Sequence, residues 1–469
     1  MHTKIIATIG PACSEKHMIQ RLVEQNVRIF RLNFSHGEAA DFEPIVADIR
    51  KVEEELQTGL TIMQDLSGPK IRAGELKESP MNINVGDEVF MGPSGEMDRF
   101  ESYLPFDHPE ILHALKKGDE VRLSDGGLRF EVREMQGEIA RMKADNNGII
   151  TSRKGVTFPG IKASISALTD KDREDLSNGL DMGVDAAAMS FVQSPEDVAM
   201  AKDVIGKKGR WIPVIAKLER QVALNRLDEI LKIADGIMVA RGDLGLETPL
   251  SSLPTLQKRI IAACNQASKP VIVATQMLLS MVSNPMPTRA ETTDVANAVL
   301  DGTDCLMLSE ETAIGQYPVE AVRYMGEIAE EAEKYFFELG ISPVKPKQQK
   351  ASENFIGYGA CLLAQNIDAK ALVAHTESGA TARLISSCRP VQTIYGLSPS
   401  PDTQKFLNFS WGVIPVLIPE EPHDHLQRTE DFVDGFPGFM EGDDLVITAG
   451  HPKPGVDRSP TNLLKIYKK

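Results

Sequence analysis

Residues 60–74 read LTIMQDLSGPKIRAG, an apolar run that leads into a Gly-Pro turn carrying the cations Lys70 and Arg72. The run has the composition of a buried strand and ends on Asp65, so a carboxylate and two cations should lie together at the end of that strand. A surface ion pair is one interpretation, and such pairs contribute little to stability. A reactive site at the strand end is the other, and the surrounding sequence bears on the choice.

Apolar runs alternate with amphipathic stretches on both sides of this turn. Three strand candidates lie up to the turn and five more follow residue 165, at 3–10, 26–34, 60–66, 184–191, 211–219, 234–243, 269–276 and 303–309. Eight strands, each followed by a helical stretch, match the count of a (β/α)8 barrel. We therefore predict the α/β class and a TIM barrel interrupted after its third strand, in preference to an open doubly wound sheet.

Two further parts are expected outside the barrel. Gly-rich sequence with alternating strands, such as GDEVRLSDGGLRFEV, predicts an inserted β-rich B domain, or lid, over residues 72–165. The stretch GISPVKPKQQKASE resembles a connection, and the strand and helix signals after it predict a smaller α/β domain over residues 341–469. The barrel is then expected to comprise residues 1–71 and 166–340.

The composition excludes several classes of protein. The 469 residues carry a formal net charge of -16, which argues against general affinity for nucleic acid or an anionic membrane. The five cysteines are scattered without a CxxC pair, and we expect them to be reduced. The sequence contains no apolar run of membrane-spanning length, and its N-terminus lacks the apolar region of a secretory signal. A cytoplasmic protein is the expectation.

The chemistry of a (β/α)8 barrel lies at the carboxyl ends of its strands. Lys217 and Glu219 are two residues apart on one predicted strand and therefore point to the same side of it. Glu219 and Asp243 together suit Mg²⁺ or Mn²⁺, which seldom receive a complete set of protein ligands. Pairing of these carboxylates with Lys217 and Arg241 is the structural alternative.

A second feature of the strand ends is their positive charge. Arg31, Arg72 and Lys217 could surround a transferring phosphoryl group, whose negative charge requires cations and positioning. The sequence has no GxxxxGKS loop and no HRD or DFG set, so a nucleotide would bind by another route. His36 could contact a phosphate, although the residues alone favour a turn histidine bonded to its neighbours.

The chain resembles pyruvate kinase in a set of motifs that occur in the family's order. These are IIATIGPA, FRLNFSHG, GPKIR, RKGVTFPG, IAKLE, VARGDLG, ATQML, PTRAETTDVANAV and MLSEETAIGQYP. The resemblance implies a barrel with a mobile B domain and a C-terminal regulatory domain. It also implies transfer of the phosphoryl group of phosphoenolpyruvate to ADP, giving pyruvate and ATP, by a homotetramer in which Arg289 reaches the partner subunit.

The resemblance also implies a role for each matching residue. Lys217 would stabilise the phosphoryl group in flight, and Glu219 with Asp243 would bind the divalent metal. Arg31 would contact the phosphate of phosphoenolpyruvate. The remaining predicted site residues are Gly242, Asp243 and Thr275 for the substrate carboxylate, Asn33, Ser35, His36, Arg72 and Lys154 for the nucleotide, and Ser309 and Glu311 for the proton that completes pyruvate.

The sequence departs from the common family pattern after the third strand. Leu66, Ser67 and Lys70 replace the usual Thr, Lys and Glu, and Glu310 replaces a usual Gly. Many members hold K⁺ through residues that match Asn33, Ser35, Asp65 and the lost Thr. A lysine ammonium is a compact cation, so Lys70 beside Asp65 is predicted to replace K⁺ and to make activity independent of it. A solvent-facing Lys70 with a weakened K⁺ site is the alternative.

The C-terminal stretch HTESGATA resembles a phosphate-binding loop. Thr376, Ser378, Gly379 and Thr381 are predicted to bind a phosphorylated effector, with a structural N-cap as the alternative. Ala380 stands where many members have an arginine or another variant residue. Because the loop has no arginine, a sugar monophosphate or AMP is favoured over a bisphosphate. Two rival functions remain at this point, a metal-dependent barrel lyase or aldolase and a non-catalytic metabolite sensor.

Overall fold

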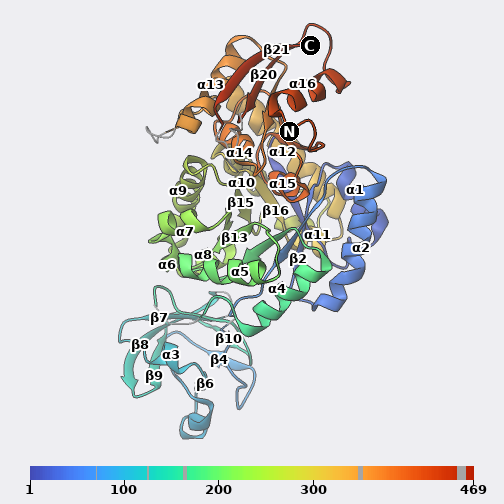
Figure 1. The fold of residues 1–469 in the computed structure, drawn as a ribbon. Coiled ribbons are helices and arrows are strands. Elements are labelled where there is room, and N and C mark those ends of the chain that lie inside the picture. The colour runs from blue at the N-terminus through green and yellow to red at the C-terminus, as the bar shows by residue number, and fades with distance from the viewer. Residues whose placement is uncertain (70, 124–125, 162–165, 347–351, 451–460) are drawn as a thin grey trace.

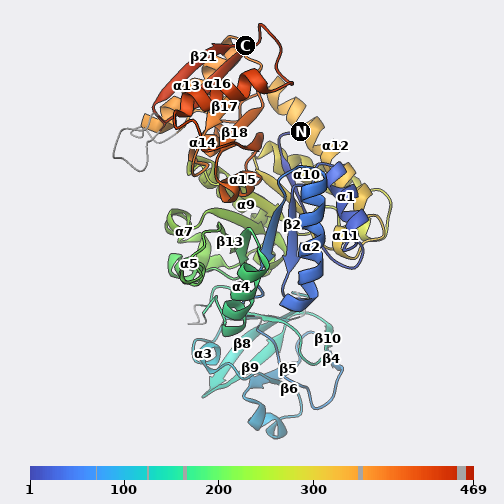
Figure 2. The ribbon, with the colours of Figure 1, turned by 45° about the vertical axis from the view of Figure 1, so that its right-hand side comes forward.

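The computed structural model of the chain describes residues 1–69, 71–123, 126–161, 166–346, 352–450 and 461–469. Three parts follow one another in space in Figure 1, with an α/β layer at the top, a barrel in the middle and a small β-rich part at the bottom. Figure 2 shows the same order after rotation, with both chain termini at the upper half of the molecule.

The barrel consists of eight parallel strands within the described residues, and it is closed. The order around it is β1-β16-β15-β14-β13-β12-β3-β2. The strands are β1 (Lys4–Thr8), β2 (Ile29–Asn33), β3 (Thr61–Asp65), β12 (Ala186–Met189), β13 (Val214–Leu218), β14 (Gly236–Ala240), β15 (Val271–Ala274) and β16 (Cys305–Leu308). The predicted TIM barrel is confirmed, and the open sheet is excluded by the pairing of β1 with both β2 and β16.

Helices surround the barrel because their apolar stripes cover the outward faces of the strands. The outer helices are α1 (Lys16–Glu24), α2 (Ala39–Glu55), α4 (Asp170–Met182), α5 (Pro195–Lys207), α7 (Leu227–Ile233), α9 (Leu253–Gln266), α10 (Arg289–Leu300) and α12 (Pro318–Glu338). Thr169, Ser194 and Thr288 each begin a helix with a capping box, in which the side chain accepts the N–H three residues on. Local sequence therefore sets where α4, α5 and α10 begin.

Short helices also follow several strand ends at the mouth of the barrel. They are α6 (Gln221–Leu224), α8 (Arg241–Glu247) and α11 (Glu310–Ala313), with the 3₁₀ turns η2 (Leu250–Ser252) and η3 (Leu279–Val282). Apart from η2, which lies between α8 and α9, each of them follows a barrel strand within a few residues.

The inserted β-rich part lies between β3 and β12 in sequence and beyond the carboxyl ends of the barrel strands in space (Figure 1). Its elements are β4 (Met81–Ile83), β5 (Glu88–Gly92), η1 (Ser94–Arg99), β6 (Tyr103–Pro105), α3 (Pro109–Leu112), β7 (Glu120–Leu123), β8 (Leu128–Gln136), β9 (Ile139–Ala144), β10 (Gly148–Ile150) and β11 (Val156–Thr157). It has its own apolar cluster, which includes the buried side chains of Phe106 and Phe130. The insertion therefore packs as a separate unit.

The C-terminal part is a five-stranded sheet within the described residues, with order β19-β18-β17-β20-β21 and only β21 antiparallel. Its elements are α13 (Ser352–Asn366), β17 (Ala371–His375), α14 (Ala380–Ser387), β18 (Ile394–Ser398), α15 (Pro401–Leu407), β19 (Val413–Leu417), α16 (His425–Gly435), β20 (Asp444–Ala449) and β21 (Leu463–Lys468). This agrees with the predicted α/β class. The three domain boundaries remain predictions, and residues 162–165 and 347–351 lie outside the described ranges.

The C-terminal part closes the amino-terminal end of the barrel. Phe406 and Phe409 join the apolar cluster of the barrel interior, and both are buried. Arg389 donates to Asp304 at 2.8 Å, and Lys405 donates to Asp185 at 3.0 Å. Residues at this end of a TIM barrel serve stability, so the opposite, carboxyl end is left for chemistry.

Candidate active site

Lys217, on β13, lies at the centre of the candidate site. Its ammonium nitrogen is 3.0 Å from Oδ1 of Asp65, 3.0 Å from Oε1 of Glu219 and 2.7 Å from Oγ of Ser190. Burial would lower the pKa of this ammonium, but the carboxylates of Asp65 and Glu219 raise it above its ordinary value. Lys217 is therefore a fixed cation at the mouth of the barrel.

Asp65, the last residue of β3, connects two cations. Its Oδ2 accepts a hydrogen bond from Nε of Arg31 at 2.6 Å, while its Oδ1 accepts from Lys217. Nη1 of Arg31 also donates to Oγ1 of Thr8 at 3.1 Å. Burial would raise the pKa of Asp65, but Lys217 and Arg31 lower it below its ordinary value. The cations beside Asp65 are therefore Lys217 and Arg31. Of the two cations that the sequence predicted there, Lys70 lies outside the described residues, and Arg72 donates to the carbonyl of Arg153 in the insertion.

Glu219 and Asp243 form the candidate metal site. Glu219 is buried, and its Oε2 accepts the main-chain N–H of Phe191 at 2.6 Å. Burial raises the pKa of Glu219 to about 7; Lys217 opposes this shift and the charge of Asp243 adds to it. In the described ranges, no group of three or more His, Cys, Asp or Glu side chains is arranged to hold a metal. Two carboxylates that repel each other nevertheless suit a hard cation whose other ligands are water and substrate oxygens.

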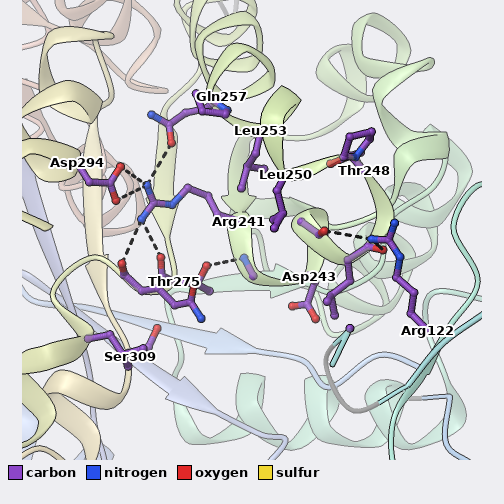
Figure 3. Close-up of a pocket in the computed structure, with 18 of the residues that line it drawn as sticks. Arg122, Arg241, Asp243, Thr248, Leu250, Leu253, Gln257, Thr275, Asp294 and Ser309 are labelled. Atoms are coloured by element: carbon purple, nitrogen blue, oxygen red, sulfur yellow. Dashed lines mark hydrogen bonds and ion pairs between the residues drawn. The ribbon is translucent and has the colours of Figure 1, made fainter. Parts of the chain in front are cut away.

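Thr275 and Gly242 lie side by side at the ends of β15 and β14. The N–H of Gly242 donates to Oγ1 of Thr275 at 2.8 Å, and φ of Thr275 is +70°, which is unusual for a β-branched residue. Arg241 donates to the carbonyl of Thr275 at 2.9 Å and to Asp294 at 2.7 Å, and these contacts are drawn in Figure 3. Arg241 thus clamps the strained turn that presents Thr275.

Ser309 and Glu311 follow β16. The carboxylate of Glu311 accepts the main-chain N–H groups of Leu278 at 3.0 Å and of Ser309 at 2.7 Å, so it holds two strand ends together. Its predicted part in proton transfer remains a prediction. Ser309, Glu310 and Glu311 line a cavity of about 1230 Å³ that also contacts Asp243 and Thr275 (Figure 3).

Two of the predicted nucleotide residues, Arg72 and Lys154, lie in the insertion. Arg72 and Lys154 line a second cavity of about 320 Å³, which Asp243 also lines. Arg72 pairs as a β-bridge with Gly155, so the two connecting segments of the insertion lie side by side. Cations from the insertion and a carboxylate from the barrel therefore border one space.

Asn33, Ser35 and His36 lie at the end of β2. Oδ1 of Asn33 accepts the N–H of Ser35 at 3.2 Å, and the N–H of His36 donates to the carbonyl of Asn33 at 3.1 Å. The three residues form a tight turn beside the end of β3, because Asn33 is in register with Asp65.

The predicted effector residues are remote from this site. Thr376, Ser378 and Gly379 lie in the C-terminal part between β17 and α14, where Gly379 has φ +78°, and Thr381 is the second residue of α14. Oγ1 of Thr381 is 2.6 Å from Oγ1 of Thr461, and the carbonyl of Ser378 accepts from Arg383 at 3.0 Å. Sequence reasoning did not find Arg383 near this loop.

The sequence analysis also missed Ser190, which contacts Lys217, and Asp294, which orients Arg241. Ser190 directly follows β12, so its position at a strand end could have identified it as a candidate site residue. Asp294 lies inside α10 and carries no such signal, because only the tertiary placement of α10 brings it to Arg241.

Comparison with known proteins agrees with this geometry. Residues 1–322 match the family described as pyruvate kinase, barrel domain, and residues 354–467 match pyruvate kinase, alpha/beta domain. The chain belongs to the pyruvate kinase family. The enzyme is accordingly a phosphotransferase of glycolysis, and the lyase and sensor interpretations have no support.

Individual relatives extend the match over the whole chain. Pyruvate kinase 2 of Synechocystis sp. is 40% identical, covering 99% of this chain and 78% of that protein. Pyruvate kinase of Thermococcus litoralis is 40% identical, covering 96% and 95%. The crystal structure of a pyruvate kinase from Cryptosporidium parvum superposes with a TM-score of 0.90 at 33% identity, covering 100% of this chain and 96% of that one. None of the helices in the described ranges has the length and apolar character needed to cross a membrane.

Replacing Lys217 with Met is expected to lower the turnover number by roughly a thousandfold, because the lost charge acts most strongly in the transition state. Steady-state kinetics with phosphoenolpyruvate and ADP measures the effect, and circular dichroism checks the fold. Lys207→Met, on the exposed face of α5, is the control. Near-normal turnover in Lys217→Met would contradict the role given to this lysine.

Proposed function

We propose that this enzyme transfers the phosphoryl group of phosphoenolpyruvate to ADP, with Mg²⁺ or Mn²⁺ bound by Glu219 and Asp243. The observation that carries the proposal is the contact of Lys217 with both Asp65 and Glu219 at the carboxyl end of the barrel. Arg31 binds the phosphate of phosphoenolpyruvate and Lys217 stabilises the phosphoryl group during transfer. The divalent cation neutralises charge on the phosphoryl and enolpyruvate oxygens when it is bound.

The other residues orient the two substrates. The main chain at Gly242 and Asp243, with the hydroxyl of Thr275, holds the substrate carboxylate. Arg72 and Lys154 approach the ADP phosphates from the insertion, which also limits access of water to the reacting group. Protonation of enolpyruvate at its methylene carbon then gives pyruvate, with Ser309 and Glu311 in the proton path.

Three further properties belong to this proposal. The enzyme assembles as a homotetramer, which the exposed Arg289 and the exposed apolar side chains of Leu250 and Met286 support. It acts in the cytoplasm, where glycolytic enzymes occur. It needs no K⁺, and a phosphorylated small molecule regulates it through the C-terminal part.

Loss of either carboxylate is expected to weaken the divalent cation. Glu219→Ala and Asp243→Ala should each raise the Mg²⁺ concentration for half-maximal activity by roughly 10- to 100-fold. Mn²⁺ binding measured by calorimetry reports the same loss without turnover. Asp203→Ala, an exposed carboxylate on α5, is the control. Unchanged Mg²⁺ titrations in both variants would rule out the metal role.

Independence from K⁺ rests on the sequence at Leu66 and Lys70. The side chain of Leu66 is buried in the apolar core and offers no ligand to a monovalent cation. Lys70 lies outside the described residues, so the proposal that its ammonium takes the place of K⁺ beside Asp65 rests on charge and position in sequence.

Turnover in Tris or tetramethylammonium salts, free of K⁺ and NH₄⁺ at fixed ionic strength, is expected to equal that in K⁺. Lys70→Glu should abolish most of this activity, with recovery in K⁺ requiring Leu66→Thr as well. Lys207→Glu controls for a surface charge reversal. Strong activation of the unmodified enzyme by added K⁺ would overturn the proposal.

The effector proposal rests on the place of residues 376–381 in the C-terminal sheet. The loop follows β17, whose neighbours are β18 and β20, so the strand order reverses at this point. Ligands of open α/β sheets bind at such reversals. The hydroxyls of Ser378 and Thr381 and the first N–H groups of α14 can hold one phosphate group there.

Ser378→Asp is expected to abolish activation by a sugar monophosphate or AMP, because the added carboxylate repels the phosphate. The measurement is the dependence of the phosphoenolpyruvate saturation curve on effector concentration. Basal turnover at saturating substrate should stay unchanged. A variant that responds as fully as the unmodified enzyme would show that the effector binds elsewhere.

A further inference from the structure

The hydroxyl of Ser190 lies between Lys217 and the main chain of Leu66. Oγ of Ser190 is 2.7 Å from Nζ of Lys217 and 2.6 Å from the carbonyl oxygen of Leu66. Ser190 directly follows β12 and is 3% exposed. A buried hydroxyl with two such short contacts has both its donor and one acceptor position in use.

The direction of these hydrogen bonds follows from the chemistry of the partners. An ammonium only donates and a carbonyl only accepts, so the hydroxyl accepts from Lys217 and gives its single proton to Leu66. The resulting chain runs from the lysine to a peptide group at the end of β3. The preceding peptide group of Leu66 is held as well, because the N–H of Leu66 donates to the carbonyl of Ala188 at 2.9 Å.

The three contacts of the Lys217 ammonium differ in charge. Asp65 and Glu219 are carboxylates. Asp65 also accepts a hydrogen bond from Arg31, and Glu219 is also the proposed ligand of the divalent metal. The hydroxyl of Ser190 is the neutral contact. It can fix the position of the ammonium without neutralising the charge that a phosphoryl group must meet.

We propose that Ser190 is a positioning residue for phosphoryl transfer, which holds the Lys217 ammonium toward the transferring group by linking it to the main chain of Leu66. The inference rests on the role proposed for Lys217. The hydroxyl of Ser190 then acts in the transition state, where Lys217 acts. It has little effect on the binding of phosphoenolpyruvate, because Arg31 holds the phosphate of that substrate.

The space around Ser190 determines which substitution can test the positioning role. A Cβ on Gly68 would lie 3.0 Å from Cβ of Ser190, so the space is tight and a Thr at 190 would crowd it. Ser190→Ala removes only the hydroxyl. Ser386→Ala is a matched control, because Ser386 is 1% exposed and its hydroxyl donates to the carbonyl of Trp411 at 2.7 Å, remote from Lys217.

Ser190→Ala is expected to lower kcat by about 10- to 100-fold, because the variant loses one hydrogen bond to a charged group and a loss of that size changes the rate by this factor. The KM for phosphoenolpyruvate should change by less than about threefold. Ser386→Ala should keep the normal kcat, and thermal unfolding of both variants measures the cost to the fold. An equal kcat in the two variants would overturn the proposal.

A second measurement does not depend on activity. Acetic anhydride labels lysines in competition, and peptide mass spectrometry gives the rate for Lys217 relative to the exposed Lys207. The relative rate should rise in Ser190→Ala, since the ammonium loses an anchor, and stay constant in Ser386→Ala. An unchanged rate in Ser190→Ala would also overturn the proposal. Absence of pyruvate kinase activity in the unmodified enzyme would instead refute the proposed function, while the labelling would still report the contact.

Discussion

The buried carboxylate of Asp65 is the interaction on which the active end of the barrel depends. It accepts from Arg31 on one oxygen and from Lys217 on the other, and it is 1% exposed. Two cations this close would repel each other in an apolar setting. Asp65 compensates both charges and so allows β2, β3 and β13 to bring them to one place.

The two ends of the barrel have different functions: the amino-terminal end stabilises the fold, and the carboxyl end carries the reactive groups. At the amino-terminal end, Phe406 and Phe409 fill the interior and buried ion pairs attach the C-terminal sheet. At the carboxyl end, the strand termini carry charged groups, and the inserted β-rich part borders the same cavities. A rigid base is what permits strained and charged groups such as Thr275 and Glu219 to persist at the mouth.

Most of the candidate site could be predicted because the carboxyl ends of all eight strands of a parallel barrel lie at the same face. Residues that are far apart in sequence but end different strands therefore lie near one another. Polar residues at these strand ends lie at the mouth of the barrel. Lys217, Glu219, Gly242 and Thr275 could therefore be predicted as site residues from the strand pattern alone. Helix starts were equally local, since Thr169 and Ser194 carry their own capping boxes.

The sequence by itself determined the barrel, the insertion after its third strand, the separate C-terminal sheet and the group of reactive strand ends, because these follow from short-range periodicity. Only the tertiary structure decided which charges meet. It pairs Asp65 with Lys217, which is distant in sequence, attaches Arg241 to Asp294, and places the hydroxyl of Ser190 between Lys217 and Leu66. The physical reason is that hydrogen-bond partners depend on separations of a few tenths of an ångström, which strand register and helix packing set and periodicity does not record.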